Sequence, residues 1–312
     1  MSYREQRRTA REPLCHTYSI VARDAVTGQL GVAVQSHYFC VGGLVPWGEA
    51  GVGVVATQAM VDPSYGPQGL ELMHAGTTAP QALEQLTAKD TGRDVRQVAM
   101  VDKDGLAAAH TGSFTIPEAG HIVGDGFSVQ ANMMLRSSVW AAMAEAYRSA
   151  RGELVDRLLA ALDAAEAQGG DIRGRQSAAL VVVARRSSGQ PWSDKLFDLR
   201  VDDAPEPLTE LRRLVGVSRA YDHLRRAQAA LARGDVSAMN TEFQAAALLI
   251  GDNPEAQFWQ AVGLMASGRI EEGLTLLGNI AAADVKWREL ALRLPEFMLR
   301  RSADLLERIR KL

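Results

Sequence analysis

Apolar and polar positions over residues 17–60 follow strand patterns. The runs TYSIVARD and QLGVAVQSHYF are joined by AVTG, and a short Asp and Gly turn between two such runs predicts a hairpin that begins at Thr17. A Gly-rich stretch at 40–49 follows, and GVGVVATQAM then predicts a third strand at Gly51 to Met60. This part of the chain is therefore expected to form a sheet.

Further along, strand and helix patterns come in groups. VDPSYGPQG leads into two short helices, with Pro80 in the first turn of the second. QVAMVD and GLAAAH flank a Lys-Asp-Gly turn and predict a second hairpin, and GFSVQAN predicts another strand. Helical spacing of apolar residues predicts helices over Met134 to Tyr147 and Leu154 to Ala165, and the strands SAALVVV and LFDLRV follow.

Groups of strands interrupted by paired helices favour an α+β fold, with stacked antiparallel sheets covered by helices, over a doubly wound sheet. Beyond Pro205 and Pro207 no strand pattern remains. Gly234 and Gly268 lie 34 residues apart in this helical region, which is the tetratricopeptide period. The alternative is an ordinary stack of helical hairpins whose spacing coincides with that period.

Composition narrows the classes of function. The chain has 312 residues, 47% of them hydrophobic and 23% charged, and a formal net charge of -3, which argues against disorder and against nucleic-acid binding. No apolar run is long enough for a membrane span, and the first sixteen residues lack the apolar core of an export signal. Two cysteines in the chain predict no disulfide framework and a cytoplasmic location.

Common cofactor and metal motifs are absent from the sequence. There is no GxGxxG, no P-loop, no HExxH and no CxxC, so we expect neither a nucleotide cofactor nor a zinc ion. His37 and Cys40 are spaced as two metal ligands, but no second pair with such spacing follows. We therefore predict no metal and no other cofactor.

Thr17 is the first residue of the first predicted strand. A threonine hydroxyl is a weak nucleophile, but at a mature N-terminus the α-amine of the same residue, with an ordinary pKa of about 7.7 to 8.0, can act as its base. The alternative is a β-branched residue that simply begins a strand. Cys15 is a second candidate nucleophile, although it lies outside the strand.

The stretch from Thr17 to about Leu214 resembles a known family. TYSIVARDAVTGQLGVAVQSHYF, AAHTG, GFSVQANMM and GGDIRGRQSAALVVV together resemble the bacterial and archaeal domain-of-unknown-function family numbered one thousand and twenty-eight. The resemblance implies a four-layer αββα sandwich of the N-terminal-nucleophile-hydrolase type. We accordingly predict an N-terminal extension at 1–16, this domain at 17–214 and a helical tetratricopeptide-like tail at 215–312.

A looser similarity to proteasome β subunits implies further site residues. It puts Gln130 and Asn132 beside Thr17 and places Thr57 and Gln58 at the oxyanion hole. The resulting catalytic candidates are Thr17, Gln58, Asn132 and Asp171. The substrate-binding candidates are Gln35, Ser36, Trp47, Glu49, Thr57, Gln130, Gln176 and Ser177.

Two hypotheses about function follow. The first is an amidohydrolase that attacks a small amide or peptide-like bond through Thr17 after removal of residues 1–16. The second is a catalytically silent scaffold of the same fold whose helical tail binds a protein partner. A tail with fewer than three repeats leaves its ends uncovered, so we also expect a homodimer.

Overall fold

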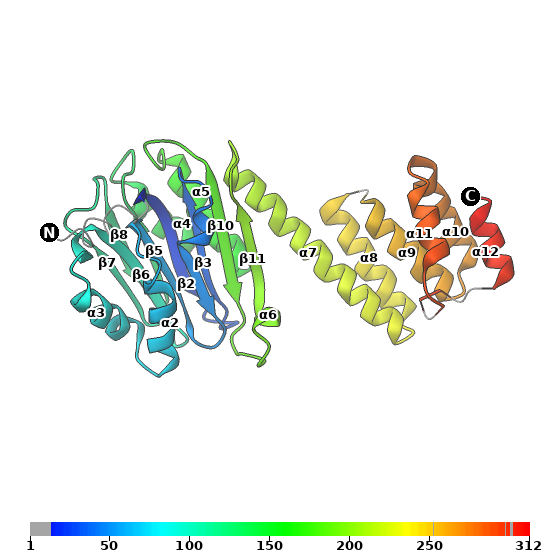
Figure 1. Ribbon diagram of the computed structural model, residues 1–312, viewed down its shortest axis with the longest axis horizontal. Helices are drawn as coiled ribbons and strands as arrows, with labels where there is room; N and C mark the ends of the chain where they lie inside the picture. Colours follow the sequence, from blue (N-terminus) through cyan, green and yellow to red (C-terminus); the bar gives the residue numbers. More distant parts are fainter. Residues whose placement is uncertain (1–13, 252, 297, 300–301) are drawn as a thin grey trace, which may run out of the picture. The chain divides into compact units, whose positions relative to one another are not determined.

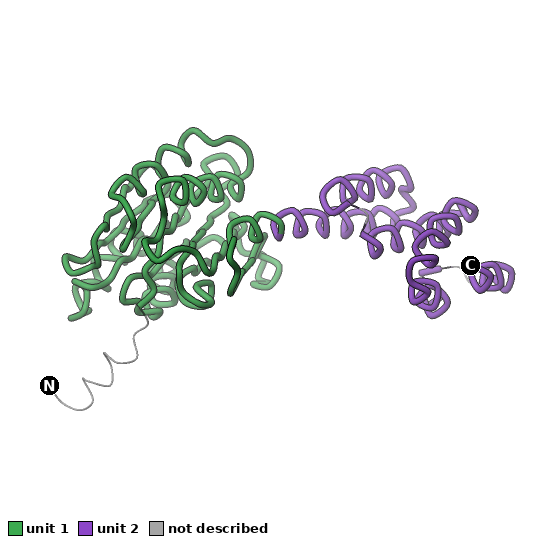
Figure 2. The backbone as a smooth tube through the Cα atoms, turned by 90° about the horizontal axis from the view of Figure 1, so that it is seen from above, with its two compact units in different colours: residues 1–213 green, residues 214–312 purple. Residues whose placement is uncertain are grey.

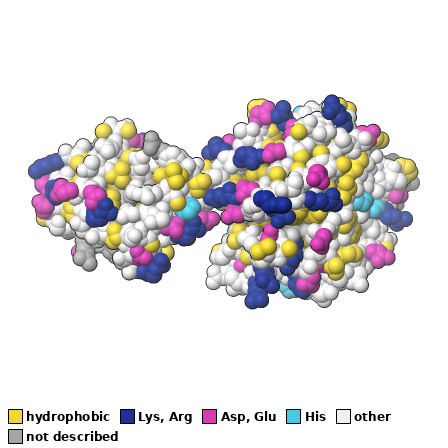
Figure 3. Space-filling view, turned by 180° about the vertical axis from the view of Figure 1, so that it is seen from behind, with side chains coloured by type: hydrophobic (Ala, Val, Ile, Leu, Met, Phe, Trp, Pro, Cys, Tyr) yellow, Lys and Arg dark blue, Asp and Glu magenta, His cyan; other side chains and the backbone are white. Residues whose placement is uncertain are grey.

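The computed structural model describes residues 14–251, 253–296, 298–299 and 302–312. The chain divides into two compact units, Met1–Arg213 and Leu214–Leu312 (Figure 2). Side chains of both charge signs lie interspersed with apolar ones on the face of each unit that Figure 3 shows.

Two antiparallel sheets face each other in the first unit (Figure 1). The first sheet has the order β1-β5-β6-β7, with β4 also paired to β5. Its strands are β1 (Leu14–Cys15), β4 (Pro46–Glu49), β5 (Gly53–Met60), β6 (Arg96–Asp102) and β7 (Ala107–Thr111). The second sheet has the order β11-β10-β3-β2-β9-β8. Its strands are β2 (Thr17–Arg23), β3 (Leu30–Ser36), β8 (Gly120–Gly124), β9 (Phe127–Ala131), β10 (Ser177–Val183) and β11 (Lys195–Val201).

Helices cover the outer face of each sheet. The first sheet packs through an apolar cluster against α2 (Tyr65–His74) and α3 (Ala79–Lys89). The second sheet packs against α4 (Val139–Ser149) and α5 (Leu154–Ala167). Short helical turns form parts of the connections: η1 (Val41–Gly43) between β3 and β4, η2 (Arg93–Val95) between α3 and β6, and α6 (Pro191–Asp194) between β10 and β11. The four layers confirm the predicted αββα sandwich.

Alternation along the strands divides the space between the sheets into an apolar and a polar part. Val21, Val54 and Val181 belong to the apolar cluster that fills most of this space. Further along the same strands the inward positions become polar, as Thr17 and Ser19 are on β2. Burial of such side chains is costly unless they are hydrogen-bonded, and Thr17 and Ser19 are paired with the Cys15 carbonyl and with Gln58.

Both predicted hairpins are confirmed. The strands β2 and β3 pair antiparallel, and Gly28 in their turn has a φ of 73°; β6 and β7 pair likewise, with Gly105 at a φ of 92°. Three short strands, β1, β4 and β8, were not predicted. They have two to five residues, and β4 and β8 contain Gly or Pro, so the sequence carries no alternation long enough to indicate them.

The second unit and the end of the first consist of helices. These are α7 (Pro207–Ala232), α8 (Val236–Ile250), α9 (Pro254–Ala266), α10 (Ile270–Ala283), α11 (Lys286–Arg293) and α12 (Ala303–Arg310). Gly234 and Gly268 each end a helix with a positive φ, at 74° and 89°, so the repeat seen in the sequence is a repeated turn. Among the described residues no helix is both long and apolar enough to cross a membrane.

Candidate functional site

Thr17 lies at the start of β2 with its side chain inside the sandwich. It is completely buried and pairs across the sheet with Ser36. Its hydroxyl donates a hydrogen bond to the carbonyl oxygen of Cys15 at 2.7 Å, and the Cys15 sulfur lies 3.6 Å from the same hydroxyl. Apart from the Cys15 thiol, no titratable side chain among the described residues contacts the Thr17 hydroxyl, so only the Thr17 nitrogen could serve as a base once residues 1–16 are removed.

The residues just before Thr17 are part of the buried structure. Leu14 and Cys15 form β1, which pairs antiparallel with Met60 and Ala59 at the end of β5. Leu14 is 51% exposed, whereas Cys15 is fully buried and His16 is 4% exposed. Burial raises the pKa of the Cys15 thiol to about 11, so this thiol is protonated and unreactive where it lies.

The carbonyl oxygen of His16, which immediately precedes Thr17, accepts two side-chain hydrogen bonds. Ser36 Oγ donates at 2.6 Å and Arg173 Nη2 at 3.0 Å. Arg173 also donates Nε and Nη2 to the two oxygens of the Asp171 carboxylate, at 3.0 and 2.7 Å, and that carboxylate is fully buried. The backbone N–H of His37 donates to Asp171 as well. The guanidinium is thus held in place against the carbonyl.

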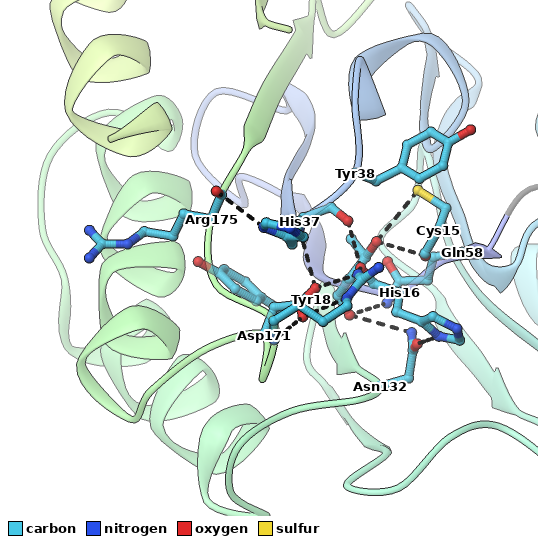
Figure 4. A network of polar contacts seen from close by, with 12 residues as sticks. Cys15, His16, Tyr18, His37, Tyr38, Gln58, Asn132, Asp171 and Arg175 are labelled. Carbon is cyan, nitrogen blue, oxygen red and sulfur yellow. Dashed lines mark hydrogen bonds and ion pairs between the residues drawn. The ribbon is translucent and has the colours of Figure 1, made fainter. Parts of the chain in front are cut away.

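A chain of side-chain amides fixes the orientation of Asn132. Gln97 Nε2 donates to the carbonyl oxygens of Ala131 and Gly120, which can only accept, so Gln97 Oε1 must be the accepting end. Asn132 Nδ2 donates to that oxygen at 2.8 Å. Asn132 Oδ1 therefore faces His16, at 2.7 Å from Nδ1 (Figure 4).

This orientation also fixes the tautomer of His16. An amide oxygen only accepts, so His16 Nδ1 carries the proton and donates it to Asn132. Nε2 of the neutral ring is then an acceptor, and it is buried with no hydrogen-bond partner among the residues that the structure describes. Burial lowers the pKa of His16 below its ordinary value of 6.5, so the ring is neutral near pH 7.

The carbonyl oxygen of Thr17 is held by two of the three other predicted catalytic residues, Gln58 and Asn132. Gln58 Nε2 donates to it at 3.2 Å and Asn132 Nδ2 at 3.4 Å. Gln58 Oε1 in turn accepts from Ser19, whose hydroxyl accepts from Gln130 Nε2 at 2.6 Å. Residues of both sheets are thereby joined in one network that anchors the first residue of β2.

The structure places the remaining predicted residues around this network or beyond it. Ser177 is adjacent to Ser36 in the sheet, but its hydroxyl donates to the carbonyl of Tyr38. Gln176 donates its side chain to Asp203. Gln35 is buried, and neither end of its side-chain amide has a hydrogen-bond partner in the described part of the chain. Of these predicted residues, Ser36 alone contacts the carbonyl before Thr17.

Three predicted substrate-binding residues lie away from Thr17. The N–H of Thr57 donates to Val45 and its hydroxyl to Asp62, so neither is free for an oxyanion. Trp47 and Glu49 line an open pocket of about 530 Å³ against α2, on the outer face of the first sheet. They therefore do not join the cluster around Thr17, which is inside the sandwich.

Arg173 and His16 are the site residues that the sequence did not indicate. Arg173 follows Asp171 by two positions in DIRGR, and this spacing was the only available signal. His16 belongs to the segment expected to be separate from the domain. Within the described ranges, no group of three or more His, Cys, Asp or Glu side chains could hold a metal ion.

The fold and site define a class of αββα sandwich proteins with a threonine at the start of an inner strand. The chain belongs to the Family of unknown function (DUF1028), whose model matches residues 17–211. It is similar to the crystal structure of protein SPO2555 from Silicibacter pomeroyi, with 34% identity, a TM-score of 0.58, and coverage of 64% of this chain and 88% of that one. No curated protein matches the chain.

Proposed function

We propose that the chain is an amidohydrolase of the N-terminal-nucleophile type, active once residues 1–16 have been removed. The observation that carries this proposal is the pair of donors on the His16 carbonyl, the group directly attached to the Thr17 nitrogen. Ser36 and Arg173 are placed to stabilise negative charge on an oxygen next to the Thr17 hydroxyl. Such an arrangement suits acyl transfer.

Thr17, Ser36, Arg173 and water supply every group that the proposed reaction needs. The freed α-amine of Thr17 takes the hydroxyl proton while Oγ1 adds to the carbonyl carbon of the substrate amide. Ser36 and Arg173 donate to the developing oxyanion. The carbon–nitrogen bond then breaks, and the leaving amine receives the proton. Water hydrolyses the ester on Thr17, which releases the acid and restores the hydroxyl.

Gln58 and Asn132 act as positioning residues in this scheme. Both donate to the carbonyl oxygen of Thr17, so they hold the nucleophilic residue from its far side. Asp171 positions Arg173 and neutralises its charge. The proposed substrate is a small amide or a peptide. We also propose a cytoplasmic location, because Cys15 and Cys40 are both free thiols.

A specific observation also favours the second hypothesis, a silent scaffold whose helical tail binds a protein partner. With residues 14–16 in place, the Thr17 nitrogen is part of a peptide bond and its hydroxyl is buried. A chain that kept these residues would have no base for the nucleophile.

We also propose that the chain forms a homodimer, and light scattering that shows only monomer at micromolar concentration would contradict this.

Intact-mass spectrometry with N-terminal sequencing tests the proposed function. We expect a species that begins at Thr17 and hydrolyses peptide amides, with activity abolished by Thr17→Ala and retained in part by Thr17→Ser. If the purified chain keeps residues 1–16, and a chain made to begin at Thr17 also hydrolyses no amide, the hydrolase is excluded and the scaffold is favoured.

A further inference from the structure

Residues 14–16 lie before the part of the chain that matches the family, yet two of the three are buried. The family match covers residues 17–211 and does not include them. Cys15 and His16 nevertheless fit into the matched domain with 0% and 4% exposure. The domain therefore contains a slot of this shape, next to Thr17, which the chain fills with its own residues.

The slot has four distinct recognition elements, three of which hold the backbone and the Cys15 side chain. The backbone of an extended strand pairs with the end of β5, as Leu14 and Cys15 do. A small side chain fits where Cys15 lies among apolar residues. The next carbonyl lies between Ser36 and Arg173, at 2.6 and 3.0 Å.

The side chain of the last residue meets a fixed acceptor. The amide chain from Ala131 through Gln97 leaves Asn132 Oδ1 as an acceptor facing this position. Asn132 is completely buried, so a side chain without a donor would leave its oxygen unpaired at a cost comparable to a lost hydrogen bond. The slot thus discriminates by hydrogen bonding and not by size alone.

We propose that this slot binds the acyl side of an extended peptide substrate whose reacting carbonyl belongs to a residue with a hydrogen-bond-donating side chain, which Asn132 recognises. The inference rests on the proposed function of Thr17. An acyl group on the Thr17 nitrogen and one on its hydroxyl are interconverted through a five-membered ring, because N, Cα, Cβ and Oγ1 are consecutive. A substrate acyl group on the hydroxyl therefore occupies nearly the place of His16.

Peptide amides test this specificity on a chain expressed from Thr17 after an initiator methionine that is removed. Its circular dichroism and melting are first compared with those of the full chain. We expect acetyl-Leu-Ala-His nitroanilide to be hydrolysed with at least about tenfold higher kcat/KM than acetyl-Leu-Ala-Leu nitroanilide. Asn132→Leu is expected to reduce that ratio to near one.

Binding of the free acid separates the two proposals. The affinities of acetyl-Leu-Ala-His and acetyl-Leu-Ala-Leu, both as free carboxylic acids, are measured by titration calorimetry, which needs no catalysis. Preferential binding of the histidine peptide without hydrolysis of either nitroanilide would support the slot and overturn the hydrolase. Equal hydrolysis of both nitroanilides would support the hydrolase and overturn the slot's specificity. A folded chain that neither binds nor hydrolyses overturns both.

The full chain provides a second test that does not depend on removal of residues 1–16. Opening of β1 exposes Cys15, and its alkylation rate is followed by mass spectrometry of the labelled peptide. We expect His16→Leu to increase this rate by about tenfold or more, and His16→Gln, which keeps a donor, to increase it less. In an Asn132→Leu background the difference between the two should disappear. Equal rates for His16→Leu and His16→Gln in the native background would overturn recognition by Asn132.

Discussion

At the scale of single residues, His16 makes the stability of the uncleaved chain depend on pH. Its folded pKa is lowered below 6.5 by burial, so as pH falls the unfolded chain binds the proton first. The stability is therefore fully present above pH 6.5 and is lost as pH falls toward the folded pKa. We expect a slope of up to about 1.4 kcal/mol per pH unit from this one proton.

Calorimetric melting of the full chain at pH 7.5, 6.5 and 5.5 measures this slope. His16→Gln keeps a donor for Asn132 and has no titrating proton, so its melting temperature should fall less across the same range. His121, whose pKa is also lowered by burial, titrates in both proteins and cancels in the comparison. Identical slopes for the two chains would contradict the assignment.

Ser36 provides the residue-scale test of oxyanion stabilisation. Its hydroxyl donates at 2.6 Å to the His16 carbonyl, and replacing it removes one donor without leaving a buried charge. We expect Ser36→Ala to reduce kcat/KM of the chain beginning at Thr17 by about 10² to 10³, mostly through kcat. Steady-state kinetics on a peptide nitroanilide measure it. A change in KM alone would show that Ser36 only binds the substrate.

The sequence could indicate part of this site. Thr17 begins a predicted strand, and the similarity places Asn132 and Gln58 near it, where both contact its carbonyl oxygen. The contact of Arg173 with His16 joins residues 157 positions apart. Neither residue lies in a pattern that signals such a contact, since it depends on how the segment after α5 meets the start of β2.

At the scale of elements, Gly112, directly after β7, packs closely against the backbone of η2. A Cβ at this position would lie 2.3 Å from the carbonyl oxygen of Asp94, which already accepts from Phe114 at 2.7 Å. Backbone atoms cannot rotate away, so Gly112→Ala is expected to cost about 1–3 kcal/mol of stability.

Gly216 in α7 is the matched control. A Cβ there meets no atom of the described residues within 4 Å, so Gly216→Ala is expected to stabilise its helix by about 0.5–1 kcal/mol. Urea unfolding of both variants gives the comparison. An equal change in the free energy of unfolding for the two variants would mean that the backbone around Gly112 moves away from the new Cβ without cost.

Periodicity predicted the paired helices of the sandwich but not all of their ends. The helix expected from Met134 begins at Val139, because Met134 forms a β-bridge with Asp171 and Leu135 donates to Gly170. These bonds join segments far apart in the sequence and override the apolar spacing. The same limit explains why β1 was not predicted, since its partner is the end of β5.

At the scale of the whole molecule, each unit has its own apolar core. The clusters that include Val54 and Met100 lie within the first unit, and those that include Phe258 and Phe243 lie within the second. In the sequence, the strand pattern ends near Asp203 and the family resemblance ends at about Leu214, which predicts a boundary in this stretch. Composition alone could not say whether the two cores merge.

Phe258→Ala tests whether these cores are independent. Phe258 is completely buried and its ring centroid lies 5.1 Å from that of Trp259 and 5.4 Å from that of Trp287. Its truncation should destabilise the helical unit by about 3–5 kcal/mol, seen as an earlier loss of helical circular dichroism on heating. The alkylation rate of Cys15 in the first unit should not change below that transition. A parallel rise in Cys15 reactivity would show that the stability of the sandwich depends on the tail, and the site around Thr17 would then be coupled to the helical unit.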